Sequence, residues 1–302
     1  MLQESHEGEE FSLPTFEGEQ LNFPLAPLTS WHIGGQAERF YLPASVEALS
    51  NYLALLPQGT KLTWLGLGSN VLIRDNGIAG AVICTRKCQE CYQREDGTFY
   101  VQAGVTCAKF ARFATKLGYA DAAFFAGIPG TIGGALAMNA GAWGAETWEW
   151  VQSVTLINRQ GIILERAPND YDIAYRSVRA KEHNPDEAFM SAVFRFPHGS
   201  IDGMTKIREL LKKRSETQPI GTFNCGSVYR NPPGDFAARL IEACDLKGYR
   251  VGDAIISEKH ANFIINCNHA SAQDVETLMT TIESAVWARF NIKLQAEVRI
   301  LG

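Results

Sequence analysis

Between residues 127 and 144 the chain reads GIPGTIGGALAMNAGAWG, a stretch with six glycines, one proline, one asparagine and no formal charge. Glycine destabilises regular helices and strands by about 0.5–1 kcal/mol relative to alanine, so a run this dense favours turns over one long element. Backbone N–H groups released from regular pairing can form nests that bind anions, and positions without a side chain let a phosphate approach closely. The run therefore predicts a loop that contacts a phosphate-bearing ligand.

Two other interpretations of this run are a membrane span and a purely structural loop. The uncharged window over residues 122–145 is long enough to span a bilayer, but its proline, asparagine and glycines make it weakly apolar. Asp121 and Glu146, rather than basic residues, flank the window, which also argues against a membrane span. The remaining alternative is a structural glycine loop that binds nothing.

A second glycine motif favours the ligand. Residues 61–73 read KLTWLGLGSNVLI, a strand-like segment that stops at the turn GLGSN and then resumes as another strand-like run. A Rossmann fingerprint would need GxGxxG at the start of a helix and an acidic residue about twenty positions later. Here the chain returns to a strand and the pattern is incomplete. The two motifs together predict two phosphate-binding turns outside a Rossmann fold.

Length and composition describe an ordinary globular chain. With 302 residues, of which 46% are hydrophobic and 20% charged, the usual domain size predicts two domains. The formal net charge of −5 argues against nucleic acid or an anionic membrane surface as the main partner, because binding to either depends on an excess of basic residues. We expect a monomer that binds small molecules and no metal, nucleic acid or membrane.

Residues 1–21 are predicted to form a flexible acidic extension. The first twenty residues contain six glutamates and no lysine or arginine, which is the wrong charge for a secretory signal or a mitochondrial transit peptide. Without an export signal, the seven cysteines are expected to be reduced thiols in a cytoplasmic protein.

One cysteine pattern offers a different function. Cys84, Cys88 and Cys91 have the spacing that radical enzymes use to hold an iron–sulfur cluster. However, the segment GAVICT is strand-like, and an EDG turn at residues 95–97 precedes the strand-like TFYVQAG. We therefore expect the three thiols to lie on a hairpin rather than in a loop that wraps a cluster.

The remaining pattern predicts an α+β architecture. Strands are expected over residues 39–43, 151–157, 162–165 and 188–196. Helices are expected over residues 45–56, from a cap at Thr106 to Leu117, over residues 201–217 and over residues 272–290. Because the pattern changes after Pro197, a domain boundary is predicted near residue 199.

Seven motifs, in this order, resemble the UDP-N-acetylenolpyruvoylglucosamine reductase family: SWHIGGQAERFYLP, GLGSNVLI, GIPGTIGGALAMNAGAWG, AYRS, CGSVYRNPPG, KHANFIIN and AEVRILG. The resemblance covers residues 22–302. It implies an FAD-binding domain of the p-cresol methylhydroxylase type over residues 22–199, with lobes over 22–83 and 84–199. A smaller α+β substrate-binding domain over residues 200–302 would follow, and its last strand could return toward the first lobe.

The resemblance also implies an activity in bacterial cell-wall synthesis. NADPH would reduce a tightly but non-covalently bound FAD, which would then reduce the enolpyruvyl ether of UDP-N-acetylglucosamine to UDP-N-acetylmuramate. Arg176 in AYRSVRA matches the arginine that holds the intermediate's negative charge, Ser227 in CGSVYR matches the proton donor, and Glu297 in AEVRILG matches a glutamate beside the reacting carbons. Without the resemblance, Ser227 would be a turn residue and Glu297 a partner for Arg299 on one strand face.

Ligand contacts implied by the resemblance fall in the two glycine turns and near the catalytic serine. FAD contacts carry over to Gly66, Gly68, Ser69, Asn70, Val71, Leu72, Gly127, Ile128, Pro129, Gly130, Thr131, Gly133, Gly134, Asn139, Gly141 and Ala142. Substrate contacts are predicted for Arg214, Arg230 and Asn231, with a solvated helix face as the alternative for Arg214. Cys225 is an alternative proton donor, and His260 is expected to be structural.

Two features depart from the common family pattern. The short spacing between Arg176 and Ser227 resembles the shorter form of the family, which lacks the tyrosine-bearing loop that closes over the nucleotide. Serine also follows Arg176 directly, where many relatives have one residue in between. The alternatives are another flavin oxidoreductase of the same fold, and a nucleotide-binding module without catalysis. Other flavin oxidoreductases of this fold often tether their flavin through a His or Cys, and residues 66–70 contain neither. A nucleotide-binding module would leave the three catalytic matches unexplained.

Overall fold

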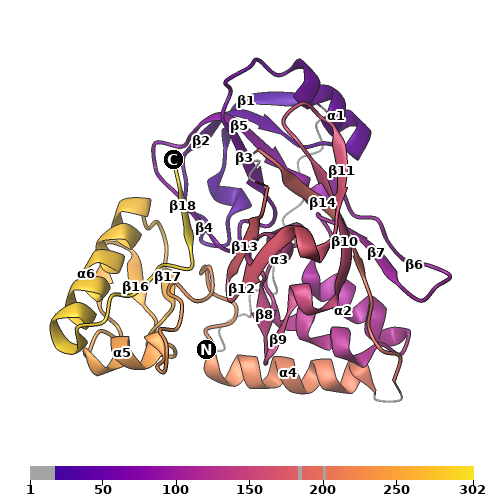
Figure 1. The fold of residues 1–302 in the computed structure, drawn as a ribbon. Helices are drawn as coiled ribbons and strands as arrows, with labels where there is room; N and C mark the ends of the chain where they lie inside the picture. Colours follow the sequence, from indigo (N-terminus) through magenta and orange to yellow (C-terminus); the bar gives the residue numbers. More distant parts are fainter. Residues whose placement is uncertain (1–17, 183–185, 200–201) are drawn as a thin grey trace, which may run out of the picture.

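The computed structural model describes residues 18–182, 186–199 and 202–302. The chain folds into a first lobe (residues 18–90), a second lobe (residues 91–217) and a C-terminal unit (residues 218–302) (Figure 1). The α+β prediction is confirmed. Residues 1–17 of the predicted extension lie outside the described residues, whereas residues 19–21 begin a paired strand, so the predicted end of the extension at residue 21 is wrong.

The first lobe is built on a four-stranded sheet with the strand order β1-β2-β5-β3. β1 and β2 are antiparallel, whereas β2, β5 and β3 are parallel. Its core contains Leu25, Phe40, Leu65 and Val82. Its elements are β1 (Glu19–Pro24), η1 (Ala26–Leu28), β2 (Gln36–Tyr41), α1 (Val46–Leu55), β3 (Leu62–Leu65), β4 (Val71–Ile73), β5 (Ile78–Cys84) and η2 (Thr85–Lys87).

The second lobe is built on a five-stranded antiparallel sheet with the order β11-β10-β14-β7-β6. Helix α2, helix α4 and the 3₁₀ helix η3 pack together beside it, around an aromatic core that includes Phe99, Phe110, Phe125 and Phe194. The main elements are β6 (Cys91–Gln93), β7 (Phe99–Gln102), α2 (Cys107–Lys116), η3 (Ala120–Gly127), β10 (Val151–Ile157), β11 (Ile163–Arg166), β14 (Ala188–Phe194) and α4 (Gly203–Thr217).

A smaller set of elements in the second lobe carries the site. They are α3 (Ile132–Met138), the short pair β8 (Gly141–Ala142) and β9 (Ala145–Glu146), η4 (Thr147–Trp150), η5 (Pro168–Asp170), and the hairpin of β12 (Tyr171–Ala174) and β13 (Ser177–Ala180). Residues 122–145 are thus divided among several short elements. None of the helices in the described ranges has both the length and the apolar character needed to cross a membrane.

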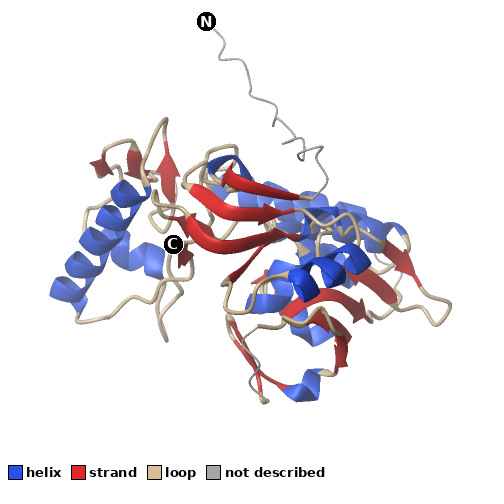
Figure 2. Cartoon of the chain, turned by 90° about the horizontal axis from the view of Figure 1, so that it is seen from above, coloured by secondary structure: helices blue, strands red, loops and turns tan. Residues whose placement is uncertain are grey.

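The C-terminal unit consists of two helices and a small antiparallel sheet with the order β15-β16-β17. Its core includes three residues of the first lobe, Trp31, Ile33 and Leu72. The last strand, β18, lies parallel to β4 of the first lobe, and Figure 2 shows the C-terminal unit to one side of the two lobes. Its elements are α5 (Ala237–Ala243), β15 (Arg250–Val251), β16 (Ala254–Ile256), β17 (Ile264–Asn266), α6 (Ala272–Phe290) and β18 (Arg299–Leu301).

The predicted domain boundary separates helix α4 from the elements on which it packs. The boundary near residue 199 assigns α4 to the C-terminal domain, but α4 packs on η3 and α2 of the second lobe, where Ile207 joins the aromatic core. Because the buried face of α4 belongs to that core, we propose that the boundary follows Thr217.

Local signals predicted the helices well. Ser45 accepts a hydrogen bond from the Ala48 N–H at the start of α1, and Thr106 accepts one from the Lys109 N–H at the start of α2, so both predicted helices are confirmed. The predicted helix over residues 272–290 is confirmed as α6, and Ser271 and Asp274 form a capping box at its start.

The cysteine spacing does not correspond to one hairpin. Cys84 ends β5 in the core of the first lobe, Cys88 follows η2 beside α1, and only Cys91 lies on the β6–β7 hairpin. The prediction that all three share a hairpin is therefore wrong. Burial raises the pKa values of Cys88 and Cys91 to about 11, which favours neutral thiols over cluster-binding thiolates. Within the described ranges, no group of three or more His, Cys, Asp or Glu residues could hold a metal ion.

Candidate active site

The two glycine turns meet in the structure. The Ser69 hydroxyl of the first turn donates a hydrogen bond of 2.7 Å to the Pro129 carbonyl of the second. A Cβ atom on Gly66 would lie 2.5 Å from Thr131 Oγ1, so only glycine permits this close approach. On the second turn, a Cβ atom on Gly127 would lie 2.3 Å from the ring of Trp143. Dense glycine at these positions thus allows backbone and side chains to pack closely.

Three adjoining cavities lie around this contact, with volumes of about 490, 530 and 230 Å³. All three are lined in part by Ser69, Pro129 and Arg214. The first cavity, of 490 Å³, lies between the glycine turns, the tip of the β12–β13 hairpin and the C-terminal unit. The second, of 530 Å³, lies on the side of the first lobe and α2.

The glycine-turn residues divide into two groups. Those that line the first or second cavity are Ser69, Asn70, Gly127, Ile128, Pro129, Gly130, Gly141 and Ala142. Those that line neither of these cavities are Gly66, Gly68, Val71, Leu72, Thr131, Gly133, Gly134 and Asn139. Leu72, for example, is fully buried in the core that joins the first lobe to the C-terminal unit.

The donors at the first turn suit an anion. Within the described ranges, the backbone N–H groups of residues 67–70 donate to no acceptor, and the buried Thr131 hydroxyl nearby has no partner. Successive unpaired N–H groups in a turn form a concavity that binds phosphate. Together with the volume of the adjoining cavities, these donors fit a dinucleotide with a pyrophosphate.

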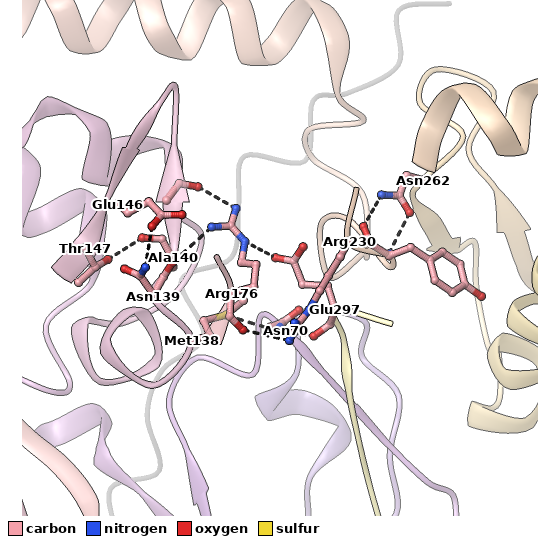
Figure 3. A network of polar contacts seen from close by, with 12 residues as sticks. Asn70, Met138, Asn139, Ala140, Glu146, Thr147, Arg176, Arg230, Asn262 and Glu297 are labelled. Carbon is pink, nitrogen blue, oxygen red and sulfur yellow. Dashed lines mark hydrogen bonds and ion pairs between the residues drawn. The ribbon is translucent and has the colours of Figure 1, made fainter. Parts of the chain in front are cut away.

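Arg176 lies at the tip of the β12–β13 hairpin, with its backbone in the left-handed region at φ 54°. A non-glycine residue in that region is strained and needs support from its surroundings. Nε donates to Glu297 Oε1 at 2.9 Å, Nη1 to the Asn139 carbonyl at 3.3 Å and Nη2 to the Gly141 carbonyl at 3.1 Å (Figure 3). These contacts hold the guanidinium beside the first cavity, which it lines.

Asn139 connects the hairpin to the glycine-rich run. Its Nδ2 donates to Glu146 Oε2 at 2.7 Å and to the Ala174 carbonyl at 3.3 Å, and its Oδ1 accepts from the Trp148 N–H. The side chain is predicted to contact the cofactor, whereas in the structure it is buried and lines none of the three cavities. These contacts position the hairpin that bears Arg176.

Glu297 precedes β18, lines the first cavity and is bonded directly to Arg176 (Figure 3). Burial raises the pKa of this carboxyl, whereas the charges of Arg176 and Arg230 act in the opposite direction. The side chains of Arg176 and Glu297 are 16% and 12% exposed, so the pair is largely desolvated. The alternative pairing of Glu297 with Arg299 is wrong, because Arg299 is exposed on β18 and Glu297 bonds to Arg176.

Ser227 also lines the first cavity. The Glu297 N–H donates to the Val228 carbonyl at 2.8 Å, so the backbone next to Ser227 is bonded directly to that of Glu297. Burial raises the pKa of the neighbouring Cys225 thiol well above its usual range. The fold thus brings Arg176, Ser227 and Glu297, which are far apart in sequence, to one cavity.

The predicted substrate residues occupy different positions. Arg214 lines all three cavities, and burial lowers its pKa. Asn231 lines the first cavity, and its Oδ1 accepts from the Ala237 N–H at the start of α5. Arg230 instead supports the hairpin tip, because its Nη2 donates to the Arg176 carbonyl at 3.0 Å. His260 is half-buried, packs edge-on against Phe263 and lines none of the three cavities.

Sequence reasoning missed several residues that line the first cavity. Trp143 and Tyr175 expose 40% and 48% of their surface there, and Lys213 adds a cation beside Arg214. Each is adjacent to a predicted residue or lies within a quoted motif, so a search of the neighbours of each motif would have found them.

Two family models match this chain. The model described as an FAD binding domain matches residues 37–166. The model described as the C-terminal domain of UDP-N-acetylenolpyruvoylglucosamine reductase matches residues 218–301 and begins directly after α4.

Curated relatives and a solved structure match nearly the whole length. A UDP-N-acetylenolpyruvoylglucosamine reductase from Coxiella burnetii (strain Dugway 5J108-111) is 50% identical over 300 residues, covering 92% of this chain and 94% of that protein. One from Methylococcus capsulatus is 49% identical over 281 residues, covering 92% and 91%. The crystal structure of the reductase from Thermus caldophilus superposes with a TM-score of 0.80 at 27% identity, covering 94% of this chain and 98% of that chain.

Proposed function

This chain belongs to the UDP-N-acetylenolpyruvoylglucosamine reductase family, and on that premise we propose that Arg176, Ser227 and Glu297 act together on the enolpyruvyl group of the substrate. The chain is an FAD-dependent oxidoreductase of peptidoglycan precursor synthesis, with NADPH as electron donor. The observation that carries the proposed roles is that all three side chains line one cavity next to both glycine turns.

FAD held at the two glycine turns would supply hydride-transfer chemistry between NADPH and the enolpyruvyl group. Hydride addition at the methylene carbon of the substrate leaves negative charge on the adjacent carbon and its carboxylate. Preorganised cations and hydrogen-bond donors stabilise such charge most effectively in a desolvated site. The chain therefore has to provide a cation and a proton donor at this position.

Arg176 provides the cation. Its guanidinium has five N–H donors, and three of them are used by Glu297 and the carbonyls of Asn139 and Gly141. One N–H on each terminal nitrogen is left, which suits two-point binding of the substrate carboxylate. Because the protein already fixes the other three donors, the guanidinium need not reorganise when charge develops.

Ser227 donates the proton that completes the reduction. Its hydroxyl is directed to no described acceptor and lines the cavity, so it is available to the substrate carbon. A serine hydroxyl is a weak acid, but a carbanion intermediate is basic enough to need only a positioned donor. Cys225, the alternative donor, is buried, and burial raises the pKa of its thiol well above its usual range, so we assign it a structural role.

Glu297 orients Arg176 and borders the reacting carbons. Because burial and the neighbouring arginines act on its pKa in opposite directions, a change of charge in the cavity alters how readily it binds a proton. A bound carboxylate next to Arg176 offsets that cation's effect on Glu297, so the carboxyl can help to protonate the intermediate.

Arg214 and Lys213 hold the diphosphate of the substrate in this proposal. Both line the first cavity from the end of α4, and Arg214 lies where all three cavities adjoin. Arg214 donates only to Gln218 Oε1, at 2.9 Å, and forms no ion pair within the described ranges. Asn231 closes the same cavity from the C-terminal unit. We further propose a monomer, because one chain supplies every group that this mechanism uses. We also propose a cytoplasmic location.

The test is to separate the two half-reactions in Ser227→Ala. NADPH should still bleach the flavin absorbance at close to the normal rate, whereas reoxidation by the enolpyruvyl substrate should slow by about 10²–10⁴-fold, the usual contribution of a positioned acid. Stopped-flow absorbance measures both steps.

The matched control is Ser215→Ala. Ser215 is exposed on α4 and bonds only to the Lys212 carbonyl through its hydroxyl, so both half-reactions should be unchanged. Equal slowing of both steps in Ser227→Ala would contradict the proton-donor role.

A further inference from the structure

Arg86 is a buried cation next to the cofactor-binding turns. It lies in η2, directly after β5, and only 6% of the residue is exposed. Its Nε donates to the Gly66 carbonyl at 2.9 Å and its Nη2 to the Leu28 carbonyl at 2.7 Å. The side chain therefore joins the first glycine turn to the segment that follows β1.

No carboxylate balances this charge. Within the described ranges Arg86 forms no ion pair, and burial lowers its pKa because the charged form is desolvated. A desolvated cation is costly unless an anion or several acceptors compensate for it. Two carbonyl groups satisfy hydrogen bonds but supply no negative charge. The positive charge of Arg86 is therefore not neutralised by any residue of the described ranges.

The free part of the guanidinium faces the second cavity. Nη1 donates to no residue in the described ranges, yet it is not an enclosed atom, and Arg86 lines the cavity of about 530 Å³. The same cavity is bordered by Ser69 of the first turn and Gly130 of the second. The unpaired N–H groups of residues 67–70 are in the same turn that Arg86 holds through Gly66.

We propose that Arg86 is the counter-charge for a pyrophosphate bound in the second cavity, and that this pyrophosphate is the one in FAD. This inference rests on FAD as the cofactor and goes beyond the catalytic roles proposed above. Backbone N–H groups bind phosphate oxygens without neutralising them, and Arg86 supplies the positive charge that the turn lacks. The residue thereby makes the site selective for a flavin dinucleotide over riboflavin.

The UDP-linked substrate also contains a diphosphate, which has the same chemistry as the pyrophosphate of FAD. The two sources are separated by position: Arg214 lies at the junction with the catalytic cavity, whereas Arg86 lines only the second cavity of the three. We therefore assign the substrate diphosphate to Arg214 and the cofactor pyrophosphate to Arg86. Each assignment predicts a change in the binding of a different ligand.

The experiment compares two variants of the full chain, Arg86→Gln and Arg86→Lys. Gln keeps an N–H donor for a carbonyl but removes the charge, whereas Lys keeps the charge but cannot span both carbonyls. FAD, FMN and riboflavin are titrated into apoprotein by quenching of flavin fluorescence. Arg86→Gln should weaken FAD binding by about tenfold to a hundredfold and leave riboflavin affinity nearly unchanged. Arg86→Lys should keep most of the preference of the wild type for FAD.

Arg159→Gln is the matched control. Arg159 also donates to two carbonyls, those of Thr60 and Pro57, but it lines none of the three cavities around the site. It should leave the affinities for all three flavins unchanged. UDP titrated into holoenzyme of Arg86→Gln should bind as in the wild type, and UDP binding to Arg214→Gln holoenzyme should weaken.

Several outcomes would overturn the proposal. If Arg86 has only a structural role, both variants should weaken the binding of FAD and of riboflavin equally, and both should lower the melting temperature. If Arg86→Gln does not fold, Arg86→Lys still tests the proposal. A folded Arg86→Lys that loses the preference for FAD over riboflavin would contradict it. Weaker UDP binding with normal FAD binding would assign Arg86 to the substrate. A wild-type chain that binds no flavin would remove the cofactor assignment itself, a failure distinct from unaltered FAD binding in Arg86→Gln.

Discussion

The C-terminal unit meets the two lobes through interfaces of opposite character. Against the first lobe it forms a continuous apolar core, in which Trp31, Ile33 and Leu72 pack among residues of α5, α6 and β16. Main-chain pairing of β18 with β4 extends this interface, and Trp31 Nε1 donates to the Ile264 carbonyl at 2.7 Å. Asp75 of the first lobe accepts from the Ala272 N–H at the start of α6.

Against the second lobe the contacts are polar and lie around the first cavity. Arg176 pairs with Glu297, and Arg230 donates to the Arg176 carbonyl (Figure 3). Lys259 donates to the Ser215 carbonyl. The two interfaces therefore have different roles. Burial of apolar area fixes the C-terminal unit to the first lobe, whereas polar groups that a ligand can contact face the second lobe. Substrate can therefore bind in the cleft without disturbing the core that holds the unit in place.

The largest effect is predicted for Trp31→Ala, on the apolar interface. Trp31 is fully buried, so the substitution removes apolar contacts, leaves a cavity and frees the Ile264 carbonyl. The free energy of unfolding should fall by about 3–5 kcal/mol, as measured by urea denaturation. Trp287→Ala on α6, where the ring is 54% exposed, is the control and should change stability by less than about 0.5 kcal/mol. Similar losses in both variants would contradict the comparison.

A smaller and different effect is predicted for Arg176→Lys, on the polar interface. Lysine keeps the charge but cannot hold Glu297 and two carbonyls while binding a carboxylate at two points. Reoxidation of the flavin by substrate should slow by about 10²–10³-fold, which corresponds to about 2.7–4 kcal/mol. Stability should fall by less than in Trp31→Ala, because lysine keeps the positive charge beside Glu297. A loss of stability as large as that in Trp31→Ala would show that this interface also holds the fold together.

The smallest effect is predicted for the pH dependence of stability in Glu297→Gln. The folded state raises the pKa of Glu297 above 4.5, so the folded chain binds this proton more tightly than the unfolded chain. Its contribution to stability is therefore fully present below pH 4.5 and is lost as the pH rises through the folded-state pKa. Since glutamine does not titrate, the stability of the variant relative to wild type should increase across that window. Urea denaturation at a series of pH values measures this difference, and a constant or falling difference would contradict it.

Much of the fold followed from local sequence. The predicted cap at Thr106 located the start of α2, and the sequence pattern located α1, α6, β10 and β14. The packing of α4 on η3 was not predicted, because an amphipathic helix next to a boundary can bury its apolar face on either side. The pattern also gave no reason to place Cys84, Cys88 and Cys91 in separate environments.

The site, like the fold, was predicted only in part from the sequence. Glycine density located both turns, and the family resemblance named Arg176, Ser227 and Glu297, which the fold brings to one cavity. The ion pair of Arg176 with Glu297 was not predicted, since periodicity favoured Arg299 as the partner. Arg86 was not noticed at all, because a single arginine after a strand carries no motif.

The sequence by itself determined where the backbone must turn, where helices begin and which residue types are available for chemistry, because these properties depend on neighbours along the chain. Only the tertiary structure decided which charges face one another, which stay unpaired beside a cavity, and which lobe holds the last strand. The physical reason is that such contacts join residues far apart in sequence, and their energies depend on burial and packing that no local pattern encodes.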